Sequence, residues 1–397
     1  MEEFLWEETT TSDAGWYSYN DVSNGDRKAK ANAPVLKGNM KPIKYVGPEA
    51  DTQGGSKWAN AMTTDGSMWV WIPRYAYKIT EGYHTNQAGT IEVAFLDTNN
   101  HFLNGETGTL TTNPEEEGAG QTKWLVHPAF TSNASYGGEF GELEGIWVGK
   151  FEATGTYSNG DASKVSVKPG VKSLIGITIN DQYKAGKTAI YKENINLNSH
   201  MMKNSEWGAI VYLTNSKYGV NRKKVEINES SSYYTGGTKE VEKIYTTNKR
   251  QSTTYNATGV YDLSGGAFER VASYVNNGNG NLGTYGGTNS GDIYGATNQE
   301  QSTSTKYKTV YSSENNQLKD YETTRKKNKG DAIYETSSSE FAVTGSWFEV
   351  LAEFPHGSYP FFIRGGAAGN NTITGLYCFS NCDGSDTPFS FRPVLVP

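Results

Sequence analysis

Cysteine, long apolar runs and an excess of positive charge are scarce or missing in this chain of 397 residues. The two cysteines, Cys378 and Cys382, are four positions apart, and a disulfide between them would close a tiny loop and stabilise little, so they do not indicate a redox compartment. No run approaches the roughly 18 apolar residues of a membrane helix, and residues 1–4 do not begin a signal peptide. The net charge is −7, and the one dense basic cluster, at 325–329, is predicted to be a solvated loop, so nothing indicates a nucleic-acid binder.

Apolar residues make up 35% of the chain and the mean hydropathy is −0.65, values that alone would favour disorder. The aromatic content argues against disorder, because 26 Tyr, 15 Phe and 9 Trp can build a core from side chains that each bury a large area. The 45 glycines, with many Asn and Ser, indicate numerous turns. The composition therefore predicts a folded chain that is rich in β-structure and loops.

Two strands and two helices have clear signals. Strands are predicted at 68–73 and 145–152, where aromatic and β-branched residues gather. Helices are predicted around 180–185 and from an N-cap at Ser205 to a stop at Gly219. Five tryptophans in or beside such blocks are expected in the core: Trp69, Trp71, Trp147, Trp207 and Trp347.

The organisation predicted along the chain is an N-terminal extension or attachment segment at 1–57, followed by one domain at 58–397. Two polar insertions interrupt that domain near 220–256 and 278–340. In the C-terminal region, 346–397, apolar blocks of strand type alternate with short segments of Gly, Asn, Ser, Asp and Thr. Apolar strand residues are buried, and loop residues can be substituted without unfolding the core. This pattern is therefore typical of a rigid scaffold that presents an adaptable surface.

Several ordered blocks together resemble a known family. In sequence order they are Trp69-Val70-Trp71-Ile72-Pro73, Ile146-Trp147-Val148-Gly149-Lys150-Phe151-Glu152, Asn204-Ser205-Glu206-Trp207, Gly259-Val260-Tyr261-Asp262-Leu263-Ser264-Gly265, Arg364-Gly365-Gly366 and Phe391-Arg392-Pro393. The order resembles the formylglycine-generating-enzyme-like branch of the C-type lectin fold, over roughly 66–397 without the insertions. The ending resembles variable proteins diversified by retroelements, and related tail and pilus-tip proteins of phages and bacteria.

The resemblance implies an α+β fold of the C-type lectin type, with two helices and a twisted antiparallel sheet whose last strands carry a solvent-facing binding surface. It implies that Trp347 and Phe348 anchor this region and that 364–366 and 391–393 are scaffold. It places the variable, ligand-binding positions at Glu349, Leu351, Glu353, His356, Ser358, Tyr359, Ala367, Ala368, Asn370, Asn371, Thr372, Asn381, Asp383, Ser385, Asp386 and Thr387. Two further aromatic residues are predicted as ligand contacts because such side chains suit binding surfaces, Tyr377 and Phe389.

The enzymes of this family hold copper through two thiolates placed just after the Arg-Gly-Gly motif. Here those positions fall near Asn370 and Gly375, which supply no thiolate, and both cysteines lie downstream. The related iron-dependent sulfoxide synthases need clustered histidines, whereas the five histidines here are scattered. The block 267–270 also departs from the enzyme pattern. The resemblance therefore implies a retained fold without the chemistry, with no catalytic residue, metal or cofactor.

A calcium-dependent sugar site is not indicated, because the Glu-Pro-Asn, Gln-Pro-Asp and Trp-Asn-Asp motifs are missing. Asn381, Asp383 and Asp386 could bind a hard cation through oxygen atoms. An Asx-rich turn is the favoured interpretation of these residues, because Asn and Asp are common in turns.

The sequence thus predicts a non-enzymatic receptor-binding or adhesin protein with a variable surface, which recognises a protein or glycan on a host or partner surface. The predicted location is extracellular, on a cell surface or on a virion, either as a phage protein released by lysis or as an exported protein without its leader or anchor. The alternatives are a metal oxidase of the formylglycine-generating or sulfoxide-synthase type, and a purely structural phage or pilus subunit.

Overall fold

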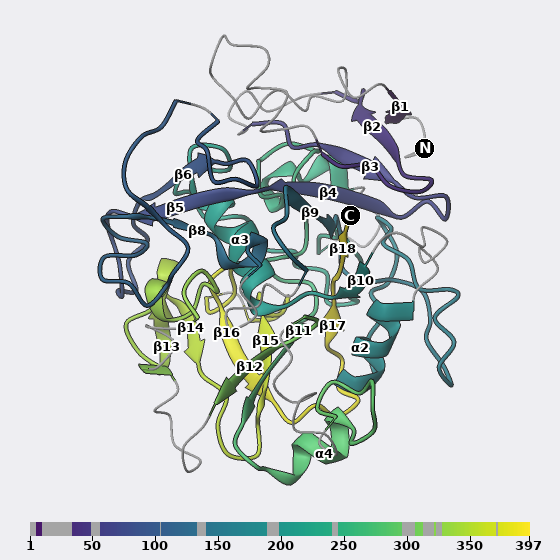
Figure 1. Ribbon diagram of the computed structural model, residues 1–397. Helices are drawn as coiled ribbons and strands as arrows, with labels where there is room; N and C mark the ends of the chain where they lie inside the picture. Colours follow the sequence, from purple (N-terminus) through teal and green to yellow (C-terminus); the bar gives the residue numbers. More distant parts are fainter. Residues whose placement is uncertain are drawn as a thin grey trace.

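The computed structural model shows an α+β protein (Figure 1). The residues that it describes contain three α-helices and three β-sheets. None of these helices has the length and apolar character needed to cross a membrane. The described residues are 5–9, 34–48, 56–103, 105–132, 140–188, 198–239, 245–295, 306–312, 321–322, 328–370 and 372–397.

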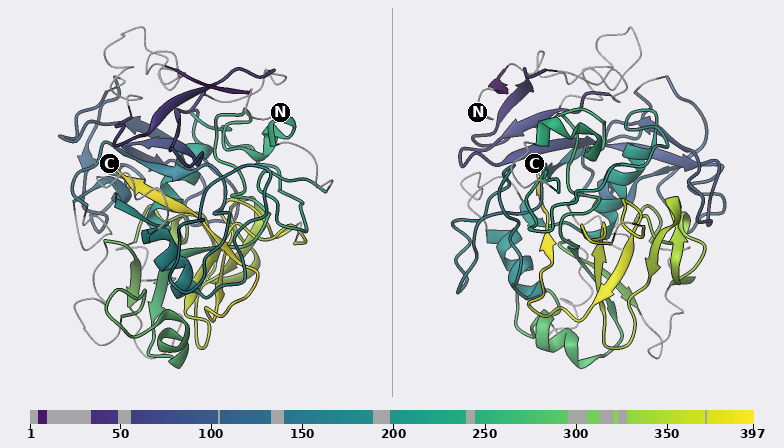
Figure 2. Two further views of the ribbon diagram at one scale, coloured as in Figure 1. Left: turned by 90° about the vertical axis from the view of Figure 1, so that its right-hand side faces the viewer. Right: turned by 180° about the vertical axis from the view of Figure 1, so that it is seen from behind.

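The first sheet is antiparallel and crosses one end of the molecule (Figures 1 and 2). Its strand order is β1-β2-β3-β4-β9-β18-β10, so the last strand of the chain lies between β9 and β10. The strands are β1 (Trp6–Glu8), β2 (Lys41–Tyr45), β3 (Asn60–Met62), β4 (Met68–Pro73), β9 (Gly145–Gly149), β18 (Pro393–Val396) and β10 (Asn198–Met201). The described parts of the predicted N-terminal extension, β1 and β2, therefore continue the sheet of the main domain.

The second sheet is mixed and fills the opposite end of the molecule (Figures 1 and 2). Its strand order is β12-β11-β15-β16-β14-β13, and β17 pairs with β11. The strands are β11 (Glu269–Asn276), β12 (Thr309–Ser312), β13 (Phe341–Ser346), β14 (Val350–Glu353), β15 (Phe361–Arg364), β16 (Phe379–Cys382) and β17 (Ser390–Phe391). This sheet carries most of the C-terminal region, whereas the resemblance implies one antiparallel sheet.

A small third sheet has the order β6-β5-β8-β7 and lies beside α3. Its strands are β5 (Tyr75–Ile79), β6 (Ile91–Phe95), β7 (Leu110–Thr111) and β8 (Trp124–Val126).

The helices are α2 (Ile179–Thr188), α3 (Asn204–Asn215) and α4 (Gly280–Gly286), one more than the resemblance implies. The α3 helix is buried along its whole length and contacts β6 and β11. It begins one residue before Ser205, because the Glu206 carboxylate accepts from the backbone N–H of Lys203 at 2.8 Å and caps the first turn. The N-cap is Lys203 and the C-cap is Ser216. The predictions of Ser205 as N-cap and of Gly219 as the stop were therefore wrong, although the helix itself is confirmed.

Two hydrophobic clusters meet at the middle of the first sheet, where β4, β9 and β18 are buried on both faces. Val70 and Ile72 of β4 belong to the cluster around α3, whereas Trp69 and Trp71 belong to the cluster around α2. The five predicted core tryptophans are all confirmed, each at most 1% exposed. Burial on both faces explains why 68–73 reads as a continuous apolar run instead of an alternating one.

Parts of the two predicted insertions that the structure describes are packed into the core. Ser252, Thr253 and Thr254 are buried, and the Thr253 hydroxyl accepts from the backbone N–H of Val260 at 3.0 Å. Of the basic cluster at 325–329, the structure describes the last two residues. Lys329 is buried and its ammonium donates to the Ala119 carbonyl at 3.0 Å, so the prediction of a solvated loop was wrong there.

Candidate functional site

Arg364, the last residue of β15, ties the C-terminal region to the rest of the molecule. The side chain is fully buried, and its guanidinium donates to the carbonyl oxygens of Cys378 (3.1 Å), Asp331 (3.0 Å) and Ala332 (3.0 Å). It also donates to Oδ1 of Asn204 at the start of α3, at 2.9 Å. A rigid planar donor that reaches four acceptors fixes β15 against α3 and the 331–332 segment.

Arg392 ties the last strands of the chain to the rest of the molecule in the same way. It is fully buried between β17 and β18, and its Nη2 and Nε donate to the two carboxylate oxygens of Glu269 at 2.5 and 3.1 Å. The remaining donors reach the carbonyl oxygens of Gly149 and Tyr261, both at 2.8 Å. This bidentate pair links β11, β9 and the last strands.

Three buried carboxyl groups gather around Arg392. Burial raises the pKa of Glu269 to about 7, although the Arg392 charge opposes the rise. Burial, with the nearby charges of Glu269 and Asp262, raises the pKa of Glu152 well above its ordinary value. One oxygen of Glu152 accepts from the backbone N–H of Ala267 at 3.1 Å, and the other has no partner among the described residues. Burial therefore favours the neutral form of Glu152 over the charged form.

The stability of the protein is expected to depend on pH through Glu152. The stability that a raised pKa contributes is complete below the ordinary value of 4.5 and is lost as pH rises through the folded-state pKa. Glu152→Gln keeps the shape and removes the titration. It is expected to raise the free energy of unfolding by about 1–3 kcal/mol at pH 8, and by less at pH 4.5.

Urea denaturation of wild type and variant at both pH values measures this difference. Glu144→Gln, at an exposed position, is the matched control and should change neither value by more than about 0.5 kcal/mol. An equal gain for Glu152→Gln at pH 4.5 and pH 8 would assign the effect to packing instead of titration.

The predicted ligand-binding residues divide between the two ends of the strands β14, β15 and β16. Strand pairing places the turn before β14 and the loop 365–378 at one end, and the connection 354–360 and the segment after β16 at the other. Four-residue strands separate these ends by roughly 13 Å, at about 3.3 Å per residue. The first end carries Glu349, Ala367, Ala368, Asn370 and Thr372; the second carries His356, Ser358, Tyr359, Asp383, Ser385, Asp386, Thr387 and Phe389.

The remaining predicted residues lie between these ends or outside the described chain. Leu351 and Glu353 share one face of β14, and Glu353 accepts from the Ser380 hydroxyl. Asn381 pairs with Phe362, which places it on the opposite face, toward the core. Asn371 lies outside the described residues.

Two predicted contact residues are interior. Tyr377 is fully buried, packs against Trp347 with ring centroids 5.1 Å apart, and donates to the Val211 carbonyl of α3 at 3.3 Å. Ala368 is 7% exposed, and its backbone N–H donates to the Gly266 carbonyl at 3.0 Å. A ligand on the surface cannot reach either side chain without moving the fold.

The segment after β16 is held from inside by Arg270. Its guanidinium donates to the Ser385 carbonyl and to the Thr387 hydroxyl, and lies over the Phe389 ring at 5.1 Å. Asp383 Oδ1 accepts from the backbone N–H of Ser385 at 2.9 Å, which is an Asx turn. The favoured interpretation as an Asx turn is confirmed at Asp383, whereas Asn381 lies within β16.

The sulfur and imidazole groups do not gather at one place. Cys378 belongs to the hydrophobic cluster around α3 and Cys382 to the cluster around α2. Burial raises the pKa of both thiols, that of Cys378 to about 12, so both are neutral at physiological pH. Among the described residues, no three His, Cys, Asp or Glu side chains lie where they could jointly hold a metal ion.

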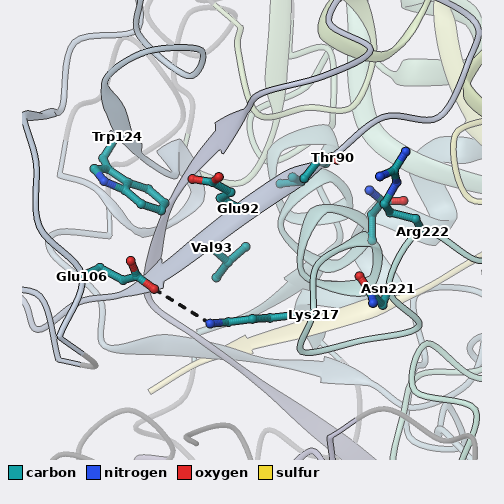
Figure 3. A pocket seen from close by; sticks show the side chains of 10 residues that line it. Thr90, Glu92, Val93, Glu106, Trp124, Lys217, Asn221 and Arg222 are labelled. Carbon is teal, nitrogen blue, oxygen red and sulfur yellow. Dashed lines mark ion pairs between the residues drawn. The ribbon is translucent and has the colours of Figure 1, made fainter. Parts of the chain in front are cut away.

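A polar cleft that the sequence did not indicate lies between β6 and the residues that follow α3 (Figure 3). The Glu349 carboxylate accepts from Gln87 at 2.9 Å, and Glu81 of the same loop accepts from Thr90 (2.8 Å) and Arg222 (3.4 Å). The cleft has a volume of about 360 Å³. Its walls are residues 90–93 with Glu106, Trp124, Asn215, Lys217, Asn221 and Arg222.

Comparisons with other proteins do not assign this chain to a family. No model of a known protein family and no curated protein matches this chain.

Proposed function

We propose that this chain is a non-enzymatic ligand-binding protein, of the receptor-binding or adhesin kind, built on a C-type lectin scaffold of the formylglycine-generating-enzyme-like type. Its variable surface is diversified by a retroelement. It acts outside the cell, at the tip of a phage tail or of a cell-surface appendage, and recognises a protein or glycan on a host or partner surface.

The main support for this proposal is that the C-terminal region contains both buried residues that fix its strands and exposed residues whose side chains form no hydrogen bond with the described chain. Arg364 and Arg392 are fully buried and bonded to distant elements, so the strands have one fixed arrangement. Asn370 and Thr372 are exposed, and their side chains bond to no other described residue. Such positions can change without unfolding the protein, which is what a binding surface of variable sequence requires.

The binding face in this proposal is smaller than the sequence alone implies. It consists of Glu349, Ala367, Asn370 and Thr372, with Leu351 beside them, because the Leu351 backbone N–H donates to the Ile373 carbonyl at 3.2 Å. Tyr377, Thr387 and Phe389 are excluded because they hold the scaffold. Short polar side chains around an apolar one can bind varied partners.

Deep sequencing of the encoding gene in a natural population tests the proposal. Substitutions are expected to concentrate at adenines in the codons for Glu349, Asn370 and Thr372, and the codons for Arg364 and Arg392 should stay constant. Asn codons begin with two adenines, so adenine-directed mutagenesis changes them most easily. A uniform sequence across these codons would contradict a diversified surface.

A stability measurement forms the second arm of this test. The double substitution Asn370→Ala with Thr372→Ala is expected to change the free energy of unfolding by no more than about 0.5 kcal/mol, because both side chains are exposed. Chemical denaturation checks this value. A loss of several kcal/mol would show that these residues belong to the scaffold.

A further inference from the structure

The cleft beside the third sheet has the size of a ligand site. Its volume of about 360 Å³ falls within the range of roughly 300–1,000 Å³ that small-molecule sites occupy. It lies between β6 and the residues that follow α3, and none of its walls comes from the C-terminal region. It is therefore a different site from the proposed variable surface.

The charges in the cleft are balanced and already paired. Glu106 lies 3.9 Å from the Lys217 ammonium, which Figure 3 shows as a dashed line. Glu92 pairs with Lys78 at 2.9 Å, and Arg222 pairs with Glu81 outside the cleft at 3.4 Å. With two carboxylates and two cations in its walls, the cleft has no net charge to attract an ion, so a neutral ligand fits best.

One polar atom in the cleft wall lacks a partner. Asn215, the last residue of α3, is 2% exposed, and its side-chain nitrogen donates to the Gly89 carbonyl at 3.2 Å. Its Oδ1 accepts no hydrogen bond from any described residue. Buried amide oxygens are normally satisfied, so this atom indicates a missing donor from a ligand or from water.

We propose that this cleft binds a neutral polyhydroxylated ligand, namely one or two sugar units. A hydroxyl group donates and accepts at once, so it can donate to the Glu106 carboxylate while it accepts from Lys217 or Asn221. Val93 and Trp124, each 3% exposed, contribute the apolar atoms of the wall. The proposal does not depend on the function proposed above.

Titrations of the full chain with neutral sugars test this inference. The probes are glucose, galactose, mannose, N-acetylglucosamine, maltose, cellobiose and lactose, with glutamate and inorganic phosphate as charged comparisons. Isothermal calorimetry and NMR of a ¹⁵N-labelled sample measure binding. At least one neutral sugar is expected to saturate the protein and to shift the side-chain amide signal of Asn215. Glutamate and phosphate are expected to do neither.

The double substitution Lys217→Met with Glu106→Gln removes one donor set and one charged acceptor at solvent-accessible positions. It is expected to raise the dissociation constant of the bound sugar at least about tenfold, at unchanged melting temperature. Lys223→Met, exposed on the same turn but outside the cleft, is the control and should leave the constant unchanged.

Three results would overturn the inference. The first is that no neutral sugar binds at millimolar concentration, and the second is that glutamate or phosphate binds in preference. The third is that sugar binding is unaffected by the double substitution, which would place the sugar elsewhere. Each result leaves the sequencing test of the variable surface intact, so the two proposals can fail separately.

Discussion

Replacing Arg392 by methionine is expected to lower the free energy of unfolding by about 3–5 kcal/mol, the usual cost of removing one partner from a buried ion pair. The substitution leaves the Glu269 carboxylate without its counter-charge and the carbonyl oxygens of Gly149 and Tyr261 without their donor. Guanidinium denaturation at pH 8 measures the loss. Because the side chain is 0% exposed, water cannot replace the missing donors unless the fold opens.

The pH dependence separates the charge from the hydrogen bonds in this prediction. The pKa of Glu269 is about 7 beside Arg392, and removing the cation raises it further. The neutral carboxyl costs less to bury, so the loss caused by Arg392→Met should be smaller at pH 5 than at pH 8. Adding Glu269→Gln should restore part of the stability at pH 8 only. A loss that is the same at both pH values would mean that the carbonyl contacts dominate.

The parts of the fold that the sequence predicted are those with strong periodic signals. The strand at 68–73 is confirmed as β4, and the helix near 180–185 is confirmed within α2. The strand predicted at 145–152 ends early, at Gly149. The next residue, Lys150, is buried, and its ammonium donates to Asn60 Oδ1 and to the Gly259 carbonyl, both at 2.9 Å, which are long-range contacts without a local signal.

The parts that the sequence could not predict depend on long-range pairing. Strand β2 has one buried residue, Ile43, in a short and otherwise polar segment, so nothing local marks it as a strand. The hydroxyl-rich stretch around Thr253 resembles a surface insertion in composition, but its hydroxyls bond to backbone groups inside the fold. Polar residues that satisfy one another can be buried, and composition alone does not show this.

The candidate surface was overestimated for a related reason. Tyr377 and Thr387 have residue types that suit binding surfaces, and their loops are polar. Their hydroxyl groups bond instead to the Val211 carbonyl and to Arg270, partners more than 100 residues away in the chain. The polar cleft was missed because its walls come from four separate segments, near residues 90, 106, 124 and 220.

Gly208→Ala is expected to destabilise the protein by about 3 kcal/mol or more, although the same change in a helix interior ordinarily stabilises by roughly 0.5–1 kcal/mol. A β-carbon at this position of α3 would clash with the Gly330 carbonyl group, reaching its carbon at 2.7 Å and Asp331 Cα at 2.9 Å. The obstacle is backbone, so it cannot rotate away. Asp331 also presents its carbonyl oxygen to Arg364, so displacing this segment loosens the hold on β15.

The matched control is Gly280→Ala, at the exposed first residue of α4, where an added β-carbon meets no atom within 4 Å. This variant should be neutral or slightly more stable, and thermal melting of both variants gives the comparison. A further test combines Gly208→Ala with Arg364→Met: the two losses should sum to more than the loss of the double variant, because both act on the 330–332 segment. Simple additivity, or a Gly208→Ala variant as stable as wild type, would show that α3 is not held against this segment and that the C-terminal strands are fixed by other contacts.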